Sequence, residues 1–546
     1  MRGRPLVAIL GATGTCVVAA ALSVWLLVGQ SPTTETAVTS VVIPIPDNPA
    51  TLAATEAQEA ERVAALPSAV KEPPAPAAPE PAVEAPPAEL FISDAIRQKL
   101  QDPELRKNVA PADLAAVEAF YAGRTGPSLW LTGTGLKPEA QRAIEEIGKA
   151  DEWGLESAVF APPNPGDAPS TPEEQAATEI KLDLAILQYA RFARGGRTNP
   201  TSLSKVIDQT PSLRDPKLVL TEIAVSSEPD AYLRSLHPKH EQFERLRQAL
   251  IKIRAEADPG IEPKGAKQVL INMERWRWMP DDLGGTYVWL NVPEFMGYVV
   301  KDGKRIHADK IVVGKPVYAT PTFSANMQTI VFNPEWTVPP TIVREDLLPK
   351  LRGGGSGWFG GGNTAILKQH KLKVRYKGRE VDPDKIDWKN VNMGAISFTQ
   401  APGPTNVLGK VKFLYPNKHI VYMHDTIKRD LLKLEVRAEG HHCPRVANPG
   451  KFAAVILAQD KGWPAAKVDE LMAKGYNSAV DLSKPVPVHT TYFTAVVDDE
   501  GKLRTFGDVY KLDAVVASAV VGRRAAPPAV ANSGPDRADS VADSTP

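Results

Sequence analysis

Residues 421–457 read VYMHDTIKRDLLKLEVRAEGHHCPRVANPGKFAAVIL, and this stretch holds the most informative side chains of the chain. Cys443 directly follows His441 and His442, and His424 lies further upstream. A thiol is nucleophilic as its thiolate, and a nearby histidine can take the proton or lower the thiol pKa. The pattern therefore predicts Cys443 as a nucleophile.

Two other interpretations of these residues stay open on composition alone. The first is an inert buried cysteine beside two surface histidines. The second is a metal site formed by His424, His441, His442 and Cys443, although adjacent ligands rarely converge on one ion. Arg445 lies two residues after the cysteine, and its guanidinium would add positive potential or bind a carboxylate of a substrate.

Short runs rich in Val, Ile and aromatic residues surround this stretch and predict a mostly β domain over residues 266–515. In YVVKDGKRIHADKIVV, Asp302 and Gly303 separate two such runs, and Asp-Gly is a strong signal for a hairpin turn. The glycine-rich segment at residues 353–363 lacks the Lys-Ser/Thr of a phosphate-binding loop. A mobile lid and a plain surface loop are its two interpretations.

Residues 90–265 have a different pattern. ADLAAVEAFY, KPEAQRAIEEIGKA and TEIKLDLAILQYARFA place apolar residues three to four positions apart, as amphipathic helices do. Pro138 fits the first turn of one of these helices. This part shows no catalytic set of side chains, so the sequence predicts an all-α scaffold domain.

The ends of the chain indicate export from the cytoplasm. Arg2 and Arg4 precede a long uncharged stretch, so residues 1–30 are interpreted as a signal anchor, with a cleaved signal peptide as the alternative. Residues 31–89 are rich in Pro, Ala and Glu and are expected to form a disordered linker. Residues 516–546 are expected to form a disordered tail of similar composition.

Composition excludes several classes of protein. Lys and Arg number 64 and Asp and Glu number 64, so the net charge is zero. A nucleic-acid-binding protein needs a basic surface and is not expected. The chain has 2 cysteines, too few for a disulfide framework or for a zinc module built from cysteine pairs.

The stretch around Cys443 resembles the L,D-transpeptidases of the YkuD fold, in which a histidine and a short helix precede SHGC, a hydrophobic residue and Arg. The wider chain is similar to the large periplasmic murein L,D-transpeptidases of Gram-negative bacteria. The similarity covers about residues 114–508. It rests on INMERWRWMP, NVPEFMGYVV, VVGKPVYATPTFS, VFNPEWTVP, QAPGPTNVLGKVKFLYPN, VYMHDT and PVPVHTTYFTAVVDDEG in this order, with AFYAGRTGPSLW and GRTNP in the helical part.

The resemblance implies an α+β multidomain chain, with the scaffold domain followed by a mostly β catalytic domain that carries a capping insertion at about residues 343–387. It implies that Cys443 attacks the carbonyl of a diaminopimelate in a peptidoglycan stem and releases the terminal D-Ala. The amine of a second stem then resolves the thioester and forms a diaminopimelate-diaminopimelate cross-link. His441 matches the catalytic histidine and would be the base. The expected oxyanion and substrate pocket comprises His424, His442, Gly440, Arg445 and Tyr422.

The resemblance implies peptidoglycan stem peptides as partners, a periplasmic location, contact with the inner membrane through the N-terminal segment, and covalent reaction with carbapenems. No cofactor is implied and no nucleic acid is expected. An outer-membrane protein is a further acceptor to consider.

The motif GHHCP departs from SHGC at several positions. Gly440 replaces Ser, His442 replaces Gly, and Pro444, which lacks a backbone N–H, follows the cysteine. The peptidoglycan-binding module of larger relatives is not expected between the helical and β parts. Alternatives to the transpeptidase are therefore a catalytically impaired peptidoglycan-binding relative, a cysteine carboxypeptidase, and a protein-to-peptidoglycan ligase.

Overall fold

The computed structural model describes residues 89–258, 261, 263–353 and 364–520. The expected signal anchor, nearly all of the expected linker, and most of the glycine-rich segment and of the expected tail lie outside these residues. Within the described ranges, no helix is both long and apolar enough to cross a membrane.

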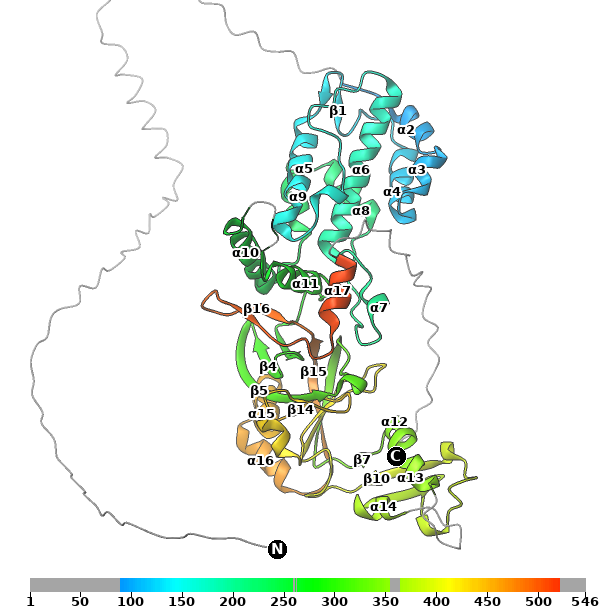
Figure 1. The fold of residues 1–546 in the computed structure, drawn as a ribbon, viewed down its shortest axis with the longest axis vertical. Coiled ribbons are helices and arrows are strands. Elements are labelled where there is room, and N and C mark those ends of the chain that lie inside the picture. The colour runs from blue at the N-terminus through cyan, green and yellow to red at the C-terminus, as the bar shows by residue number, and fades with distance from the viewer. Residues whose placement is uncertain (1–88, 259–260, 262, 354–363, 521–546) are drawn as a thin grey trace, which may run out of the picture. The chain divides into compact units, whose positions relative to one another are not determined.

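A helical domain begins the described chain and confirms the all-α prediction, apart from one short β hairpin (Figure 1). Its longest helix, α6 (Pro172–Gly195), begins with a capping box in which Thr171 and Glu174 satisfy each other's backbone N–H groups. Pro138 occupies the first turn of α5, as its sequence context predicts. The other elements are α2 (Ser93–Lys99), α3 (Pro103–Lys107), α4 (Pro111–Ala122), β1 (Leu131–Thr132), β2 (Gly135–Leu136), α5 (Pro138–Gly148), α7 (Pro200–Leu203), α8 (Pro216–Ala224), α9 (Pro229–Ser235) and α10 (Glu241–Ala255).

Two carboxylates on α6 form a buried polar cluster in this domain. Glu179 and Asp183 are both fully buried. The Tyr121 hydroxyl donates to both carboxylates, at 3.1 and 3.0 Å. Trp130 Nε1–H donates to Asp183 at 2.8 Å, and Glu179 accepts bonds from the Ser128 hydroxyl and from the backbone amides at positions 129 and 130. The cluster fixes the loop before β1 against α6.

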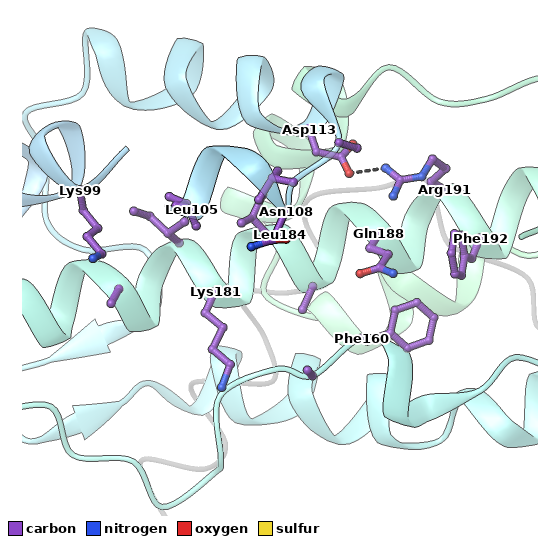
Figure 2. A pocket seen from close by; sticks show the side chains of 16 residues that line it. Lys99, Leu105, Asn108, Asp113, Phe160, Lys181, Leu184, Gln188, Arg191 and Phe192 are labelled. Carbon is purple, nitrogen blue, oxygen red and sulfur yellow. Dashed lines mark hydrogen bonds and ion pairs between the residues drawn. The ribbon is translucent and has the colours of Figure 1, made fainter. Parts of the chain in front are cut away.

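A cavity of about 440 Å³ lies along α6 in the same domain. Figure 2 shows Asp113 of α4 in an ion pair with Arg191 of α6 at this cavity. Leu105, Leu184 and Phe160 give it an apolar wall. Its lining residues include neither a cysteine nor a histidine.

The β domain is built on a nine-stranded sheet in the order β13-β5-β14-β12-β11-β6-β15-β3-β4. Strand β4 also pairs with β5, so eight of the strands close into a barrel. The strands are β3 (Thr286–Asn291), β4 (Met296–Lys301), β5 (Lys304–Gly314), β6 (Phe323–Phe332), β11 (Val411–Leu414), β12 (Met423–His424), β13 (Ala438–Gly440), β14 (Arg445–Val446) and β15 (Ser478–Thr491).

The predicted hairpin is confirmed, because Lys301 and Lys304 pair across a turn formed by Asp302 and Gly303, both with positive φ. Helices and a second hairpin accompany the barrel: α11 (Ala266–Arg277), α15 (Pro449–Lys461), α16 (Ala465–Ala473), β16 (Ala495–Val497), β17 (Leu503–Thr505) and α17 (Leu512–Val520). Helix α17 continues to Val520, and both Val516 and Val520 are buried. The expected tail therefore starts too early at residue 516, because these residues belong to the core.

A small subdomain is inserted between β6 and β11 and has a hydrophobic core of its own. Leu351, Trp388 and Phe398 are buried there. The described insertion extends from β7 to β10 and is wider than the expected range of residues 343–387. It contains β7 (Trp336–Thr337), α12 (Pro340–Ile342), a π-helical turn (Val343–Leu347), α13 (Leu348–Arg352), α14 (Ala365–Gln369), β8 (Leu372–Tyr376), β9 (Arg379–Val381) and β10 (Ile396–Gln400), with strand order β7-β10-β8-β9.

Candidate active site

Three neighbouring strands of the barrel place one row of polar side chains on one face. Lys412 of β11 is opposite His424 of β12, and His424 is opposite Arg445 of β14. Directly opposed residues of paired strands point to the same side of a sheet, and adjacent residues along a strand point to opposite sides. Phe413 and Met423 therefore face the other side, where both are fully buried in the hydrophobic core.

Cys443 precedes β14 and lies beside Tyr422, which precedes β12. Its side chain is half-buried and packs against the core of the β domain. The Tyr422 backbone amide lies close enough to the sulfur to lower the pKa of the thiol. Strands β12 and β14 pair in parallel, and next to this pairing the His424 N–H donates to the Pro444 carbonyl at 3.1 Å. Register between strands, more than nearness along the chain, thus determines what surrounds the thiol.

Burial raises the pKa of the Cys443 thiol to about 11, while the Tyr422 amide and the positive charges of Lys412 and Arg445 act in the opposite direction. A charged group loses solvation when it is buried, so the neutral thiol is favoured. At neutral pH the thiol holds its proton. A thiol in this state needs a base to become a nucleophile.

His424 has the protonation state that such a base requires. Its ring is buried, and Nδ1 bonds the backbone carbonyl of Asp425. A carbonyl only accepts, so Nδ1 carries the hydrogen and Nε2 keeps its lone pair. Burial, Arg445 and Lys412 lower the pKa of His424 to about 3, which keeps the ring neutral.

His441 has other partners than the cysteine. Its ring stacks on Tyr318 with the centroids 4.0 Å apart. Its Nε2 lies 3.6 Å from an Asp346 carboxylate oxygen in the π-helical turn of the insertion. Burial lowers the pKa of His441, and Asp346 opposes this change. Neither His441 nor His424 forms a side-chain hydrogen bond with Cys443 in the part of the chain that the structure describes.

His442 and Gly440 fix the loop that leads to the cysteine. The Nδ1 atom of His442 bonds the Ala319 carbonyl at 2.9 Å, and the His442 carbonyl accepts from the Thr320 hydroxyl at 2.7 Å. A Cβ atom on Gly440 would lie 3.0 Å from the Val313 carbonyl oxygen. This close approach to β5 leaves little room for a side chain at position 440.

These groups open into a cavity of about 670 Å³. Cys443 and five of the six other expected site residues line it, whereas Gly440, at the end of β13, does not. The lining residues among the expected set are Cys443, His441, His424, His442, Arg445 and Tyr422. Trp336 and Ile342 of the insertion contribute apolar walls, and the Trp336 indole opposes the rise that burial causes in the pKa of Tyr422. The insertion therefore borders the cavity.

The metal-site interpretation gains no support. Among residues 89–258, 261, 263–353 and 364–520, no group of three or more His, Cys, Asp or Glu side chains is placed to hold a metal ion.

Three residues near the thiol were missed by the sequence analysis: Lys412, Tyr415 and Asp425. Lys412 stands between two apolar residues in VKF, and that alternation is a signal that it shares a face with another polar residue. Asp425 contributes a backbone carbonyl, which no side-chain pattern reveals. Tyr415 reads as an ordinary core aromatic.

Comparisons with known proteins identify a family for each of the two domains. Residues 115–250 match the scaffold domain family, and residues 285–461 match the L,D-transpeptidase catalytic domain family. A curated protein of Haemophilus influenzae, whose name places it among the L,D-transpeptidases, is 28% identical over 249 residues. This similarity covers 45% of the chain and 48% of the relative, so the chain spans about half the length of the relative it matches.

Proposed function

The chain contains an L,D-transpeptidase catalytic domain preceded by a scaffold domain, and from this premise we propose that it is a peptidoglycan cross-linking enzyme with Cys443 as its nucleophile. The observation that carries the proposal is the row of Lys412, His424 and Arg445 next to a half-buried thiol in a large cavity. Such a set of groups has the parts that acyl transfer through a thioester requires.

The proposed reaction has two half-reactions. The sulfur of Cys443 attacks the carbonyl of the third stem residue, a diaminopimelate, and the thiol proton passes to His424. Collapse of the tetrahedral adduct breaks the bond to the terminal D-Ala, which takes the proton from His424 and leaves as a free amine. The amine of a second stem then attacks the thioester, gives its proton to His424, and releases the Cys443 thiolate, which recovers that proton.

The proposed base is His424, in place of His441. Its Asp425 bond fixes the tautomer with a free Nε2, and its strand runs beside the residues around Cys443. A general base must lie within reach of the proton that it removes. The His441 ring stacks on Tyr318 and lies beside Asp346. We therefore propose that His441 forms part of the cavity wall and contacts the insertion.

The backbone amides of His442 and Cys443 are the proposed donors to the oxyanion. Within the described residues, neither amide donates to a protein carbonyl. Loss of one such donor typically costs about 100- to 1,000-fold in rate. Pro444 removes the next amide of the loop, so the two remaining N–H groups carry this task.

The substrate implies a location in the cell envelope. We propose a periplasmic enzyme held at the inner membrane by residues 1–30, with a cleaved signal peptide as the alternative. Residues 31–89 would act as the tether between membrane and wall. An outer-membrane protein as acceptor would use the same acyl-enzyme.

Reaction with a carbapenem tests the proposed nucleophile, because the acyl adduct is covalent. We expect the intact mass of the full chain to rise by the mass of one carbapenem, with the adduct on the peptide that contains Cys443. Cys443→Ala should give no adduct while keeping its melting temperature. An unmodified wild-type protein that is folded would contradict the proposal and favour a binding protein without turnover.

A further inference from the structure

Strand β11 and the turn after it bring two further polar groups close to Cys443, and the proposed reaction does not yet use either. Lys412 is on the strand and Tyr415 directly follows it. Charge on the sulfur acts on both side chains: it raises the pKa of Lys412 and the pKa of Tyr415. Both groups therefore lie within electrostatic reach of the thiol.

Lys412 is a half-buried cation without a carboxylate partner among the described residues. Its Nζ lies 4.2 Å from the centroid of the Tyr422 ring, and its strand neighbour His424 is neutral. Burial lowers the pKa of Lys412, and Cys443 is the acidic group that opposes this. Burying a cation without a counter-charge costs free energy. A thiolate on Cys443 would supply that counter-charge.

Tyr415 presents an unsatisfied donor. The side chain is 1% exposed, and within the described part of the chain its hydroxyl has no hydrogen-bond partner. Buried hydroxyls are nearly always paired, and an unpaired one calls for an explanation. Burial and the Cys443 charge both raise its pKa well above the usual range, so the hydroxyl keeps its proton and remains a donor.

The position of these groups separates them from Arg445. Arg445 lines the cavity, whereas neither Lys412 nor Tyr415 is among the residues that line it. Lys412 lies against the ring of Tyr422, which itself borders the cavity. A stem peptide in the cavity would therefore meet Arg445, and Lys412 and Tyr415 would act on the sulfur from outside the cavity lining.

We propose that Lys412 and Tyr415 form an anion-stabilising floor near Cys443, unsatisfied in the resting thiol and engaged when the sulfur becomes a thiolate. Both are positioning residues. They lower the pKa of Cys443 and so favour its thiolate. The stem peptide is bound by other residues, which line the cavity. The proposal rests on the role of Cys443 as the nucleophile. It adds two groups that oppose the effect of burial on the thiol.

The test follows alkylation of Cys443 by iodoacetamide as a function of pH in the full chain, because this neutral reagent reports the thiolate without a stem peptide. The titrating and charged groups that interact electrostatically with the thiol are Lys412, Tyr415, Tyr422 and Arg445, and His424 lies opposite Arg445 in the same row. Loss of a nearby positive charge raises a thiol pKa. We expect Lys412→Met to shift the pH profile upward by about one unit and to slow alkylation at pH 8 about tenfold.

Three further variants make the outcome specific. Lys412→Arg keeps the charge and should restore most of the wild-type profile. Lys304→Met places the same substitution at an exposed lysine in β5 of the same sheet and should leave the profile unchanged. Tyr415→Phe removes only an unpaired hydroxyl, so it should fold normally and shift the profile upward by a smaller amount than Lys412→Met.

A profile that stays unchanged in both Lys412→Met and Tyr415→Phe would overturn the proposal. If Lys412→Met fails to fold, the Tyr415→Phe profile decides alone. Failure of the proposed function is distinguishable: the pH shifts would still be measured in a protein that neither releases D-Ala nor reacts with a carbapenem. Lys412→Met could instead raise KM and leave the alkylation profile unchanged. That result would assign Lys412 to substrate binding and refute the proposed anion-stabilising role.

Discussion

The molecule contains two buried polar clusters that differ in how fully their hydrogen bonds are satisfied. In the helical domain, Glu179 and Asp183 accept bonds from two side-chain hydroxyls, an indole and two backbone amides. In the catalytic domain, Lys412 has no carboxylate partner and Tyr415 no hydrogen-bond partner among the described residues. The first cluster is complete in the resting protein, and the second is incomplete.

This difference is the reason for proposing a functional role for the second cluster and a structural role for the first. A buried network whose donors and acceptors are all paired makes one conformation rigid. A buried donor or cation without a partner lowers the stability of the resting protein. It can become favourable when a negative charge forms beside it during a reaction. The pKa shifts of the acidic groups do not distinguish the two clusters, since burial raises the pKa of Asp183 and that of Cys443 alike. The clusters differ in the pattern of their hydrogen-bond and charge partners.

The largest expected effect concerns the two histidines of the site. His424→Gln should lower the rate of D-Ala release by about 100- to 10,000-fold, the usual contribution of a general base. His441→Gln should lower it less than about tenfold, because His441 contacts Tyr318 and Asp346. Steady-state release of D-Ala from a tetrapeptide stem measures both. The reverse order would return the role of base to His441.

The second expected effect compares the two buried tyrosines. Tyr121→Phe removes a hydroxyl that donates to two buried carboxylates and should cost about 1–3 kcal/mol of unfolding free energy. Tyr415→Phe removes a hydroxyl without a partner among the described residues, so stability should stay the same or rise slightly. Urea unfolding followed by far-UV circular dichroism measures both. Equal losses of unfolding free energy in the two variants would contradict the proposed difference between the two clusters.

A third expectation concerns pH. Burial, followed by the charge of Glu179, raises the pKa of Asp183 from 3.8 to about 8. A carboxyl whose pKa is higher in the folded state contributes its stability at low pH and loses it as the pH rises through this window. The melting temperature of the helical domain should therefore fall between pH 5 and pH 8. Asp183→Asn should flatten the slope, and an equally steep slope in that variant would exclude Asp183 as its source.

The smallest expected effect concerns the contact between the insertion and the site. The side chains of Asp346 and His441 are 44% and 33% exposed, and half-exposed ion pairs contribute about 0–1 kcal/mol. Asp346→Asn should change kcat/KM less than about fivefold. It should also lower the pKa of His441 slightly, which ¹H-¹⁵N NMR of the imidazole can follow. A hundredfold loss would mean that this contact assembles the active site.

The sequence predicted the domain classes because helical and strand periodicities are local. It also predicted the Asp302-Gly303 hairpin and the nucleophile candidate Cys443. The order of the strands and the closure of the barrel depend on pairings between distant segments, such as β4 with β5, which no local pattern contains. The insertion is wider than expected, because its strands β7 and β10 pair across a long stretch of sequence. Helix α17 continues beyond the expected start of the tail, because its last residues pack into the core.

Most of the expected site residues line one cavity, while the proposed exchange of roles between His441 and His424 rests on contacts that the sequence does not show. His441 is close to Cys443 along the chain, yet its ring turns to Tyr318. His424 is distant in sequence, but the ladder between β12 and β14 brings it beside the cysteine loop. Lys412 joins the same row through β11. Register across strands is therefore the information that the sequence lacked.

The central claim is that Cys443 performs acyl transfer between peptidoglycan stems. The most direct measurement incubates the wild-type chain and Cys443→Ala with a tetrapeptide stem and follows free D-Ala together with the mass of the products. We predict stoichiometric D-Ala and a cross-linked dimer of stems from the wild type, and neither from Cys443→Ala. D-Ala with only a shortened stem would indicate a carboxypeptidase, and D-Ala released equally by Cys443→Ala would contradict the account.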